Sequence, residues 1–152
     1  MRKLALATVL CAAGLSVPAL ALANEGESVV GDITPGIGFA LTTKEEGETA
    51  PTVAASINYN VTEKAAIGLL AEYAFEELDH TIVGIRFRAD VGNNFIVTVL
   101  PGVEFHESNE EILFRVGIGY DIEIGNQTLV PEFNVDFVDG ETSFVYGFAI
   151  FF

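Results

Sequence analysis

Strict alternation of side-chain type marks the last eleven residues of the chain, 142–152. Large apolar side chains occupy every second position, at Phe144, Tyr146, Phe148, Ile150 and Phe152. The positions between them are mostly small, from Ser143 to Ala149. A period of two indicates a β-strand whose two faces meet different surroundings. A strand with one uniformly large apolar face is typical of the lipid-facing wall of a transmembrane barrel.

Seven earlier stretches show the same alternation. Together with the last one they predict eight strands, at residues 31–42, 50–61, 64–75, 80–90, 94–106, 111–122, 127–138 and 142–152. Each is about ten residues long, which is the length that crosses a bilayer when the strand is tilted. We therefore predict an all-β fold, an eight-stranded antiparallel up-and-down transmembrane β-barrel. Pro51, Pro101 and Pro131 should mark local bulges, because proline cannot donate a hydrogen bond to the strand ladder.

Size decides which of the two faces points inward. A soluble lipocalin-like barrel also alternates, with its apolar face inside. An eight-stranded barrel, however, encloses a space just wide enough for side chains to fill, and the many Phe, Ile, Leu and Val residues of the apolar parity cannot all fit there. The opposite parity is rich in glycine and sparsely charged, which makes it a poor surface for water. The apolar face is therefore predicted to contact lipid, with aromatic girdles near the strand ends.

An even number of strands places both chain ends on one side of the membrane. Export through the periplasm makes that side periplasmic, with turns at 60–63, 91–93 and 123–126. The four outer loops are short and acidic, at 44–48, 76–79, 107–110 and 139–141. Such loops either hold divalent cations that bridge to lipopolysaccharide phosphates or form a solvated acidic rim.

The start of the chain has the pattern of a cleaved secretory signal peptide. A basic beginning leads into a long apolar run that ends in the small-x-small cleavage site at 21–23. The length of the run also allows a membrane anchor, against which the cleavage site argues. Cys11 raises the alternative of a lipoprotein, but Leu10 precedes it where such sites have Gly or Ala. We therefore predict a signal peptide at 1–23 and one barrel domain at 24–152.

The exported part of the chain is expected to be strongly acidic. It keeps five of the seven Lys and Arg residues and all 22 Asp and Glu residues, which gives a net charge of −17. A surface this acidic does not bind nucleic acid on its own. The single cysteine lies in the predicted leader, so disulfides are not expected to contribute to the fold.

With the leader, the eight alternating stretches and the terminal Phe152, residues 28–152 resemble the small eight-stranded outer-membrane proteins of Gram-negative bacteria, such as the OmpA transmembrane domain and OmpX. The resemblance implies a monomeric barrel in the cell outer membrane, among outer-membrane lipid and lipopolysaccharide. It also implies delivery by periplasmic chaperones and insertion by the barrel-assembly machinery. That machinery would read the C-terminal strand, through Tyr146, Phe148, Ile150 and Phe152. The outer loops here are much shorter than those that carry adhesion in such relatives, so adhesion is not expected.

Charged side chains on the inward parity form the first candidate site. They are Glu72, Arg86, Arg88, Glu104, Arg115, Glu132 and Asp136. Counting outward from the turns places Arg115 near Asp136 and diagonal to Glu104. The same count places Arg86 diagonal to Glu72. One interpretation is an interior ion-pair network that satisfies buried charges and plugs the barrel. The other is a narrow polar path, or a gate formed by exchange of ion-pair partners.

Two histidines lie at the outer ends of neighbouring predicted strands. His80 opens the fourth strand and His106 closes the fifth, so the turn between them brings the two nearly opposite each other, beside Glu104 and Asp79. Two imidazoles and a carboxylate suit a transition metal. The sequence contains no third histidine, and residues that meet at a rim are usually solvated. We therefore predict no metal site and no cofactor. If a metal did bind, His80 and His106 would be its candidate ligands.

A short motif raises an enzymatic alternative. The stretch His106-Glu107-Ser108-Asn109 resembles the His-x-Ser-Asn stretch of outer-membrane lipid A deacylases, which have a Ser/His/acid site. Here it follows the fifth strand, whereas in that family it lies near the C-terminal end of the barrel, and nucleophilic chemistry needs base and hydroxyl to face the substrate together. We predict no catalytic residues and a non-enzymatic protein with a structural role in the envelope. The alternatives are a small-solute or ion channel through the charged lumen and a lipid A-modifying hydrolase at the outer rim.

Overall fold

The computed structural model describes residues 30–75, 78–106 and 109–152. Within these ranges the chain forms the strands β1 (Ile33–Lys44), β2 (Thr49–Thr62), β3 (Ala65–Ala74), β4 (His80–Gly92), β5 (Phe95–His106), β6 (Asn109–Tyr120), β7 (Ile122–Ile124), β8 (Gln127–Val138) and β9 (Glu141–Phe151). None of the described residues belongs to a helix long and apolar enough to cross a membrane.

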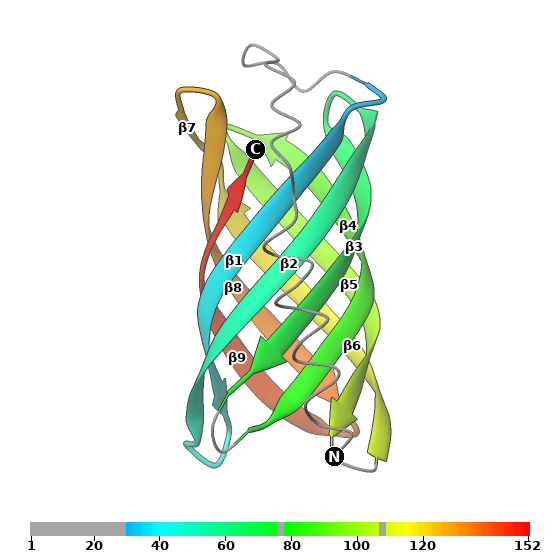
Figure 1. Ribbon diagram of the computed structural model, residues 1–152, viewed down its shortest axis with the longest axis vertical. Helices are drawn as coiled ribbons and strands as arrows, with labels where there is room; N and C mark the ends of the chain where they lie inside the picture. Colours follow the sequence, from blue (N-terminus) through cyan, green and yellow to red (C-terminus); the bar gives the residue numbers. More distant parts are fainter. Residues whose placement is uncertain (1–29, 76–77, 107–108) are drawn as a thin grey trace, which may run out of the picture.

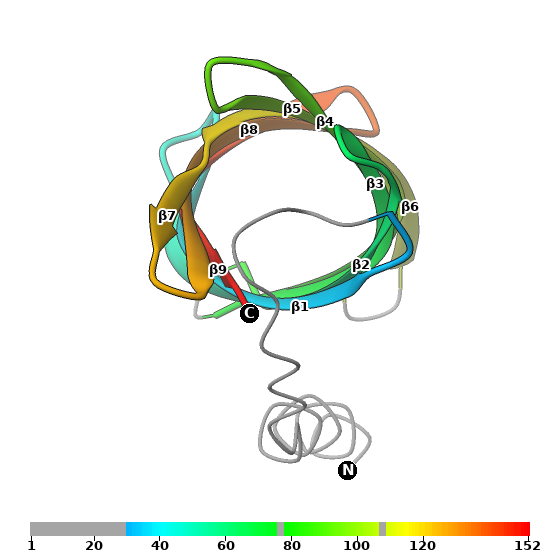
Figure 2. The same cartoon turned by 90° about the horizontal axis from the view of Figure 1, so that it is seen from above.

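Every strand is antiparallel to its neighbours, and the sheet closes on itself (Figure 1, Figure 2). Strands pair in chain order from β1 to β6, and β8 pairs with both β6 and β9. β1 completes the ring by pairing with β9, where Phe39 stands opposite Phe148. The short β7 continues the line of β6 along β8. The described strands therefore make an eight-stranded up-and-down barrel, which confirms the predicted fold.

Pro101 and Pro131 each interrupt one ladder without shifting the register, and Pro51 pairs with Leu41 in an unbroken register, so the predicted bulges are wrong. The register of β8 is the same against β6 and β7, and Pro131 stands opposite Tyr120, where the strand breaks. Because proline has no N–H to donate, the ladder opens there. The β4–β5 ladder likewise lacks pairs beside Pro101 and then resumes in the same register. In the described residues the register shifts lie elsewhere, at 60–62 and 90–92.

Two-residue turns connect several of the strands. Asn93 and Asn94 have φ angles of 55° and 63°, and Asp139 and Gly140 have φ angles of 45° and 88°. Positive φ at both central residues is the geometry of a type I′ hairpin turn, whose twist matches that of the strands it joins. The start of β1 and the end of β9 lie at the same end of the barrel, which is the upper end in Figure 1.

Outward-facing side chains form an apolar belt around the barrel wall. Its members in the middle of the strands include Ile57, Leu69, Ile85, Phe87, Phe114, Val116, Ile118, Phe133, Tyr146 and Phe148, all of them exposed. Neighbouring rings contact each other on this face, as at Phe95 and Tyr120, where the centroids are 5.1 Å apart. An exposed apolar surface of this extent is not that of a soluble protein, and it matches the lipid-facing band of a membrane barrel. The predicted orientation of the two faces is therefore confirmed.

Inward-facing side chains fill the lumen in layers. One buried apolar cluster consists of Leu70, Ile82, Leu100, Leu113 and Val138. A second lies nearer the end at which the chain terminates and consists of Ile96, Val130, Ala149 and Phe151. A third lies near the opposite end and consists of Ala50, Ala74 and Leu78. Charged side chains lie beside the first cluster, because Leu100 stands opposite Arg115 and Ile82 stands opposite Glu72.

Candidate functional site

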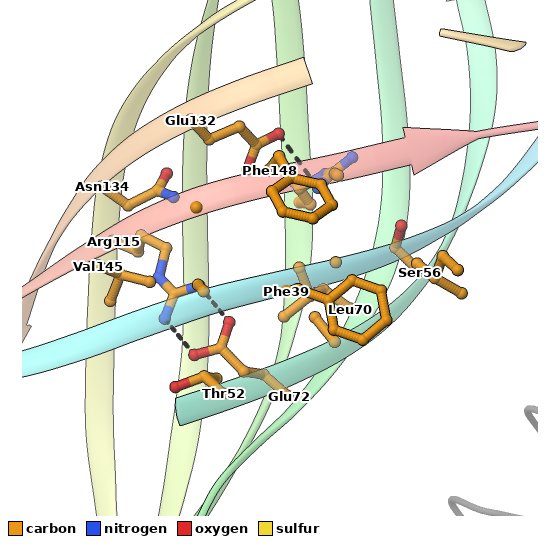
Figure 3. Close-up of a pocket in the computed structure, with 17 residues that line it drawn as sticks. Phe39, Thr52, Ser56, Leu70, Glu72, Arg115, Glu132, Asn134, Val145 and Phe148 are labelled. Carbon is orange, nitrogen blue, oxygen red and sulfur yellow. Dashed lines mark hydrogen bonds and ion pairs between the residues drawn. The ribbon is translucent and has the colours of Figure 1, made fainter. Parts of the chain in front are cut away.

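The centre of the lumen is occupied by the guanidinium of Arg115, whose residue is 3% exposed. Arg115 on β6 donates through Nε and Nη2 to the carboxylate of Asp136 on β8, at 2.5 and 2.7 Å. It also donates through Nη1 and Nη2 to Glu72 on β3, at 2.6 and 2.8 Å. Both contacts are two-pronged, which is the strongest arrangement of an Arg–carboxylate pair. Figure 3 shows Arg115 reaching across the lumen to Glu72.

Two of the partners expected from the sequence are wrong. Arg115 stands opposite Leu100 on β5, whereas Glu104 stands opposite Glu111, four residues farther along. That offset is too large for a diagonal contact, and Glu72 takes the expected place of Glu104. Arg86 likewise lies four residues along β4 from Ile82, which stands opposite Glu72. Its nearest carboxylate in the described residues is that of Glu132.

A second charged group surrounds the ring of Phe151, nearer the end of the barrel where the chain terminates. The guanidinium carbons of Arg86 and Arg88 lie 5.0 and 4.9 Å from the centre of its ring. Arg86 also lies 4.0 Å from a carboxylate oxygen of Glu132, and Arg88 donates a hydrogen bond to Asp121. Arginine above an aromatic face is attracted by the ring electrons. The group therefore combines ion pairs with cation–π contacts.

Sequence reasoning missed Asp121 and Phe151 as members of this group. A signal for both was present, because each continues the inward parity of its strand. Phe151 is the large exception among the small inward residues of β9, and it is 2% exposed. Asp121 follows Gly117 and Gly119 on the inward side of β6.

A small cavity separates the two charged groups. Its volume is about 40 Å³, and its lining includes Glu72 and Arg115 of the central group and Arg86 and Glu132 of the second group. Figure 3 shows Glu72, Arg115 and Glu132 among the lining side chains. A cavity of this size holds a few water molecules at most. The buried Nε and Nη2 of Arg86 have no hydrogen-bond partner among the described residues. Water in this cavity is the natural partner for those two donors.

Apolar side chains fill the lumen beside the charged groups. Leu100 and Ile82, which stand opposite Arg115 and Glu72, are 0% exposed, and so is Leu113. Nearer the end where the chain terminates, Ile96 and Phe151 are almost fully buried. A water-filled pore would leave lumen side chains accessible to solvent. The described part of the chain therefore forms a filled barrel.

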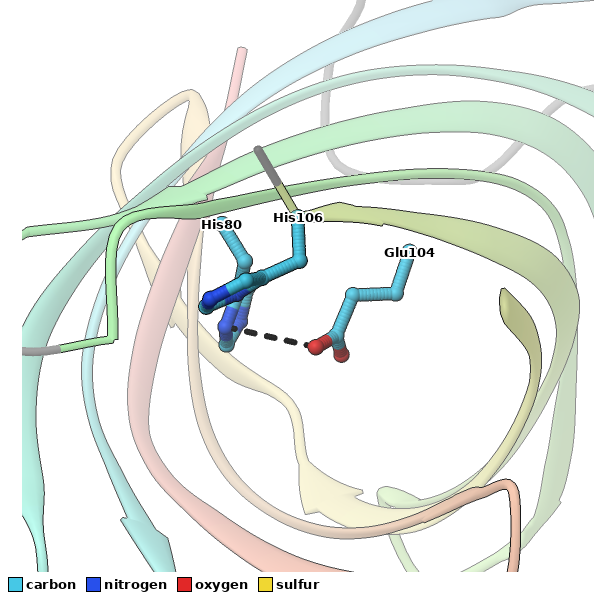
Figure 4. Close-up of side chains that lie close together, drawn as sticks. All are labelled: His80, Glu104 and His106. Atoms are coloured by element: carbon cyan, nitrogen blue, oxygen red, sulfur yellow. Dashed lines mark ion pairs between the residues drawn. The ribbon is translucent and has the colours of Figure 1, made fainter. Parts of the chain in front are cut away.

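A third polar group lies in the lumen near the outer end, beyond the apolar layer. His80 on β4 stands directly opposite His106 on β5, and Glu104 precedes His106 by two residues on the same face. The Nδ1 atom of His80 lies 3.5 Å from Oε1 of Glu104 (Figure 4). His80 and Glu104 are buried, whereas His106 is half-buried. The predicted meeting of the two histidines is thus seen, but one of them is inside the barrel and shielded from solvent.

Sequence comparisons find no relative: no protein-family model and no curated protein matches the chain. Solved structures do match. The N-terminal β-barrel domain of Pseudomonas aeruginosa OprF superposes with a TM-score of 0.60 at 12% identity, over 80% of this chain and 99% of that domain. Ail, the attachment invasion locus protein of Yersinia pestis, gives a TM-score of 0.56 at 10% identity, over 81% of this chain and 98% of Ail. The chain has the fold of the small eight-stranded outer-membrane β-barrels.

A designed protein shares the same architecture. A de novo transmembrane β-barrel superposes on this outer-membrane-type barrel with a TM-score of 0.58 at 14% identity, over 84% of this chain and all of the design. At identities this low the likeness concerns the fold alone. The roles of individual residues in this outer-membrane-type barrel must therefore be argued from its own geometry.

The remaining predicted residues belong to the deacylase-like motif and to the C-terminal strand. Glu107 and Ser108, which carry the deacylase-like motif, are outside the described residues. Of the C-terminal set, Tyr146, Phe148 and Phe152 are exposed on the outer wall, and Ile150 is half-buried. The outward side chains of β9 therefore present a continuous apolar row to the surroundings of the barrel.

Proposed function

We propose that this protein is a non-enzymatic outer-membrane barrel with a structural role in the cell envelope, and that its lumen does not conduct. The observation that carries the proposal is the filled lumen. Arg115 joins two carboxylates from opposite parts of the wall, and the apolar side chains beside it are fully buried. A barrel of eight strands is narrow enough for side chains to fill it completely.

The outer membrane is the location that agrees best with the outer wall. A belt of exposed apolar residues surrounds the barrel, and the fold is that of solved outer-membrane barrels. The predicted signal peptide at 1–23 supplies the route of export. Outer-membrane lipid and lipopolysaccharide would then be the permanent partners of a monomeric barrel.

Assembly in the membrane would depend on the C-terminal strand. Tyr146, Phe148, Ile150 and Phe152 form the outward row of β9, and β9 closes the ring by pairing with β1. A strand that pairs last and is apolar on its outer face suits recognition by the barrel-assembly machinery, with periplasmic chaperones protecting the chain before insertion.

Single-channel recording tests the closed lumen. The refolded protein is added to a planar lipid bilayer, after a shift in gel migration on heating has shown that it is folded. We expect no steady openings, because side chains and not water occupy the lumen. Steady conductance that changes in Arg115→Ala would overturn the proposal and make the protein a channel.

A further inference from the structure

His80 is buried without the hydrogen bonds that a buried imidazole requires. The residue is 2% exposed, and neither Nδ1 nor Nε2 has a hydrogen-bond partner among the described residues. The contact of 3.5 Å with Glu104 does not have hydrogen-bond geometry. Buried polar groups in native proteins are almost always satisfied, and an orphaned one often marks a bound water or ion. None of the described residues therefore supplies a partner for this ring.

The surrounding side chains present further ligands to the same point. One ligand atom each from His80, Glu104 and His106 can be chosen so that all lie within 4.8 Å of one another (Figure 4). Bonds of 2.0–2.1 Å to a tetrahedral metal correspond to ligand atoms about 3.3 Å apart. His80 and Glu104 already have nearly this separation, at 3.5 Å. His106 is half-buried, and its ligand atom lies within 4.8 Å of those of the other two residues.

The strand pairing holds these residues in place. His80 and His106 are directly opposite in the β4–β5 ladder, and Glu104 lies one step diagonally from His80 on the same face. Cross-strand neighbours have Cβ atoms only about 5 Å apart, which suits side chains that share one ion. The ligand set therefore rests on two rigid strands, and each of its members belongs to the lumen wall.

The chemistry of the three groups selects the kind of ion. Imidazole nitrogens favour zinc and its transition-metal neighbours, whereas Mg²⁺ and Ca²⁺ prefer oxygen ligands. Two imidazoles and one carboxylate leave a fourth tetrahedral position for water. We propose that His80, His106 and Glu104 form a binding site for one divalent transition-metal ion, of the Zn²⁺ type, inside the outer end of the barrel. The ion would link β4 to β5 at that end of the barrel. This proposal does not depend on whether the lumen conducts.

Titration of the refolded, untagged protein with Zn²⁺ tests the site. The chain contains two histidines, both in the site, and its single cysteine lies in the predicted leader, which is absent from the refolded barrel. Calorimetry should give one Zn²⁺ per chain. We expect Glu104→Gln and His106→Asn each to weaken binding at least about tenfold. The matched control is Glu110→Gln, which removes an exposed carboxylate from the same rim and should leave affinity unchanged.

A second measurement keeps the test valid if a variant fails to fold. In the wild-type protein, Zn²⁺ should shift the imidazole C–H resonances of both histidines together and saturate at one equivalent. Co²⁺ in place of Zn²⁺ should give the visible absorption of a tetrahedral complex. Unmoved imidazole resonances, or Zn²⁺ binding that Glu110→Gln weakens as much as Glu104→Gln does, would mean binding by the acidic rim and would overturn the proposal.

Discussion

At the scale of single residues, the buried charge of Arg115 has the largest consequences. Its guanidinium lies between two carboxylates and donates four hydrogen bonds to them. Charged groups inside a protein are stable only while they are paired and hydrogen-bonded, because desolvation of each costs several kcal/mol. The three side chains therefore stabilise one another, and removing one of them leaves a buried charge without its partner.

Replacing this arginine should destabilise the barrel strongly. We expect Arg115→Ala to lower the free energy of unfolding by about 3–5 kcal/mol, because Glu72 and Asp136 then remain buried and unpaired. The matched control is Arg88→Ala, whose partner Asp121 is partly exposed, and which should cost about 1 kcal/mol or less. Urea unfolding of the refolded proteins in detergent measures both values. Equal losses for the two variants would contradict the role given to the central cluster.

Only one of the two ion pairs in this cluster could be predicted from the sequence. Arg115 and Asp136 lie opposite each other on paired strands, so a count from the turn between them finds the pair. Glu72 comes from a strand that is not a neighbour, and whether it reaches Arg115 depends on the tilt and stagger of the strands around the barrel. Sequence periodicity carries no information on that stagger, and the expected partner Glu104 was therefore wrong.

At the scale of strands, the seam between β1 and β9 decides whether the barrel closes. The inward-facing glycines there include Gly38 on β1 and Gly147 on β9. A Cβ atom added at Gly147 would lie 2.1 Å from the carbonyl oxygen of Phe39 and 2.6 Å from Cα of Ala40. A Cβ atom added at Gly38 would come no closer than 3.3 Å, to Cβ of Ala54. Backbone atoms thus leave no room for a Cβ atom at Gly147, whereas at Gly38 a Cβ atom needs Ala54 to move by only a few tenths of an ångström.

Alanine substitutions at these two glycines should therefore differ. We expect Gly147→Ala to cost about 1–3 kcal/mol or to prevent closure, because backbone atoms cannot move aside easily. Gly38→Ala should change stability by no more than about 1 kcal/mol in either direction. The fraction of protein with the heat-modifiable gel migration, together with its urea midpoint, reports both effects. A tolerated Gly147→Ala would show that the seam is looser than the geometry indicates.

The strands themselves were the most predictable part of the molecule. Eight alternating stretches gave the number, order and facing of the strands, since period-two patterning is imposed directly by lipid on one side and a narrow lumen on the other. The prolines were misread as bulges. Pro131 instead opens the ladder opposite Tyr120, and the sequence cannot tell a missing hydrogen bond from an inserted residue.

At the scale of the whole molecule, the account depends on one barrel whose two surfaces have opposite character. The outer surface carries exposed rings such as Phe133, which is 45% exposed in the middle of β8. The inner surface is packed and holds buried charges, and its one large ring, at Phe151, is 2% exposed in the described part of the chain. A membrane is the solvent that makes both surfaces favourable at once.

Fluorescence quenching by lipids brominated on their acyl chains tests this claim most directly. The chain contains no tryptophan, so Phe133→Trp and Phe151→Trp each introduce a single probe without background. In bilayers of brominated lipid we expect strong quenching of the tryptophan at position 133, which would face the acyl chains, and little at position 151, which would lie in the lumen. Quenching at position 151 without quenching at position 133 would place the apolar parity inside and contradict the membrane-barrel account.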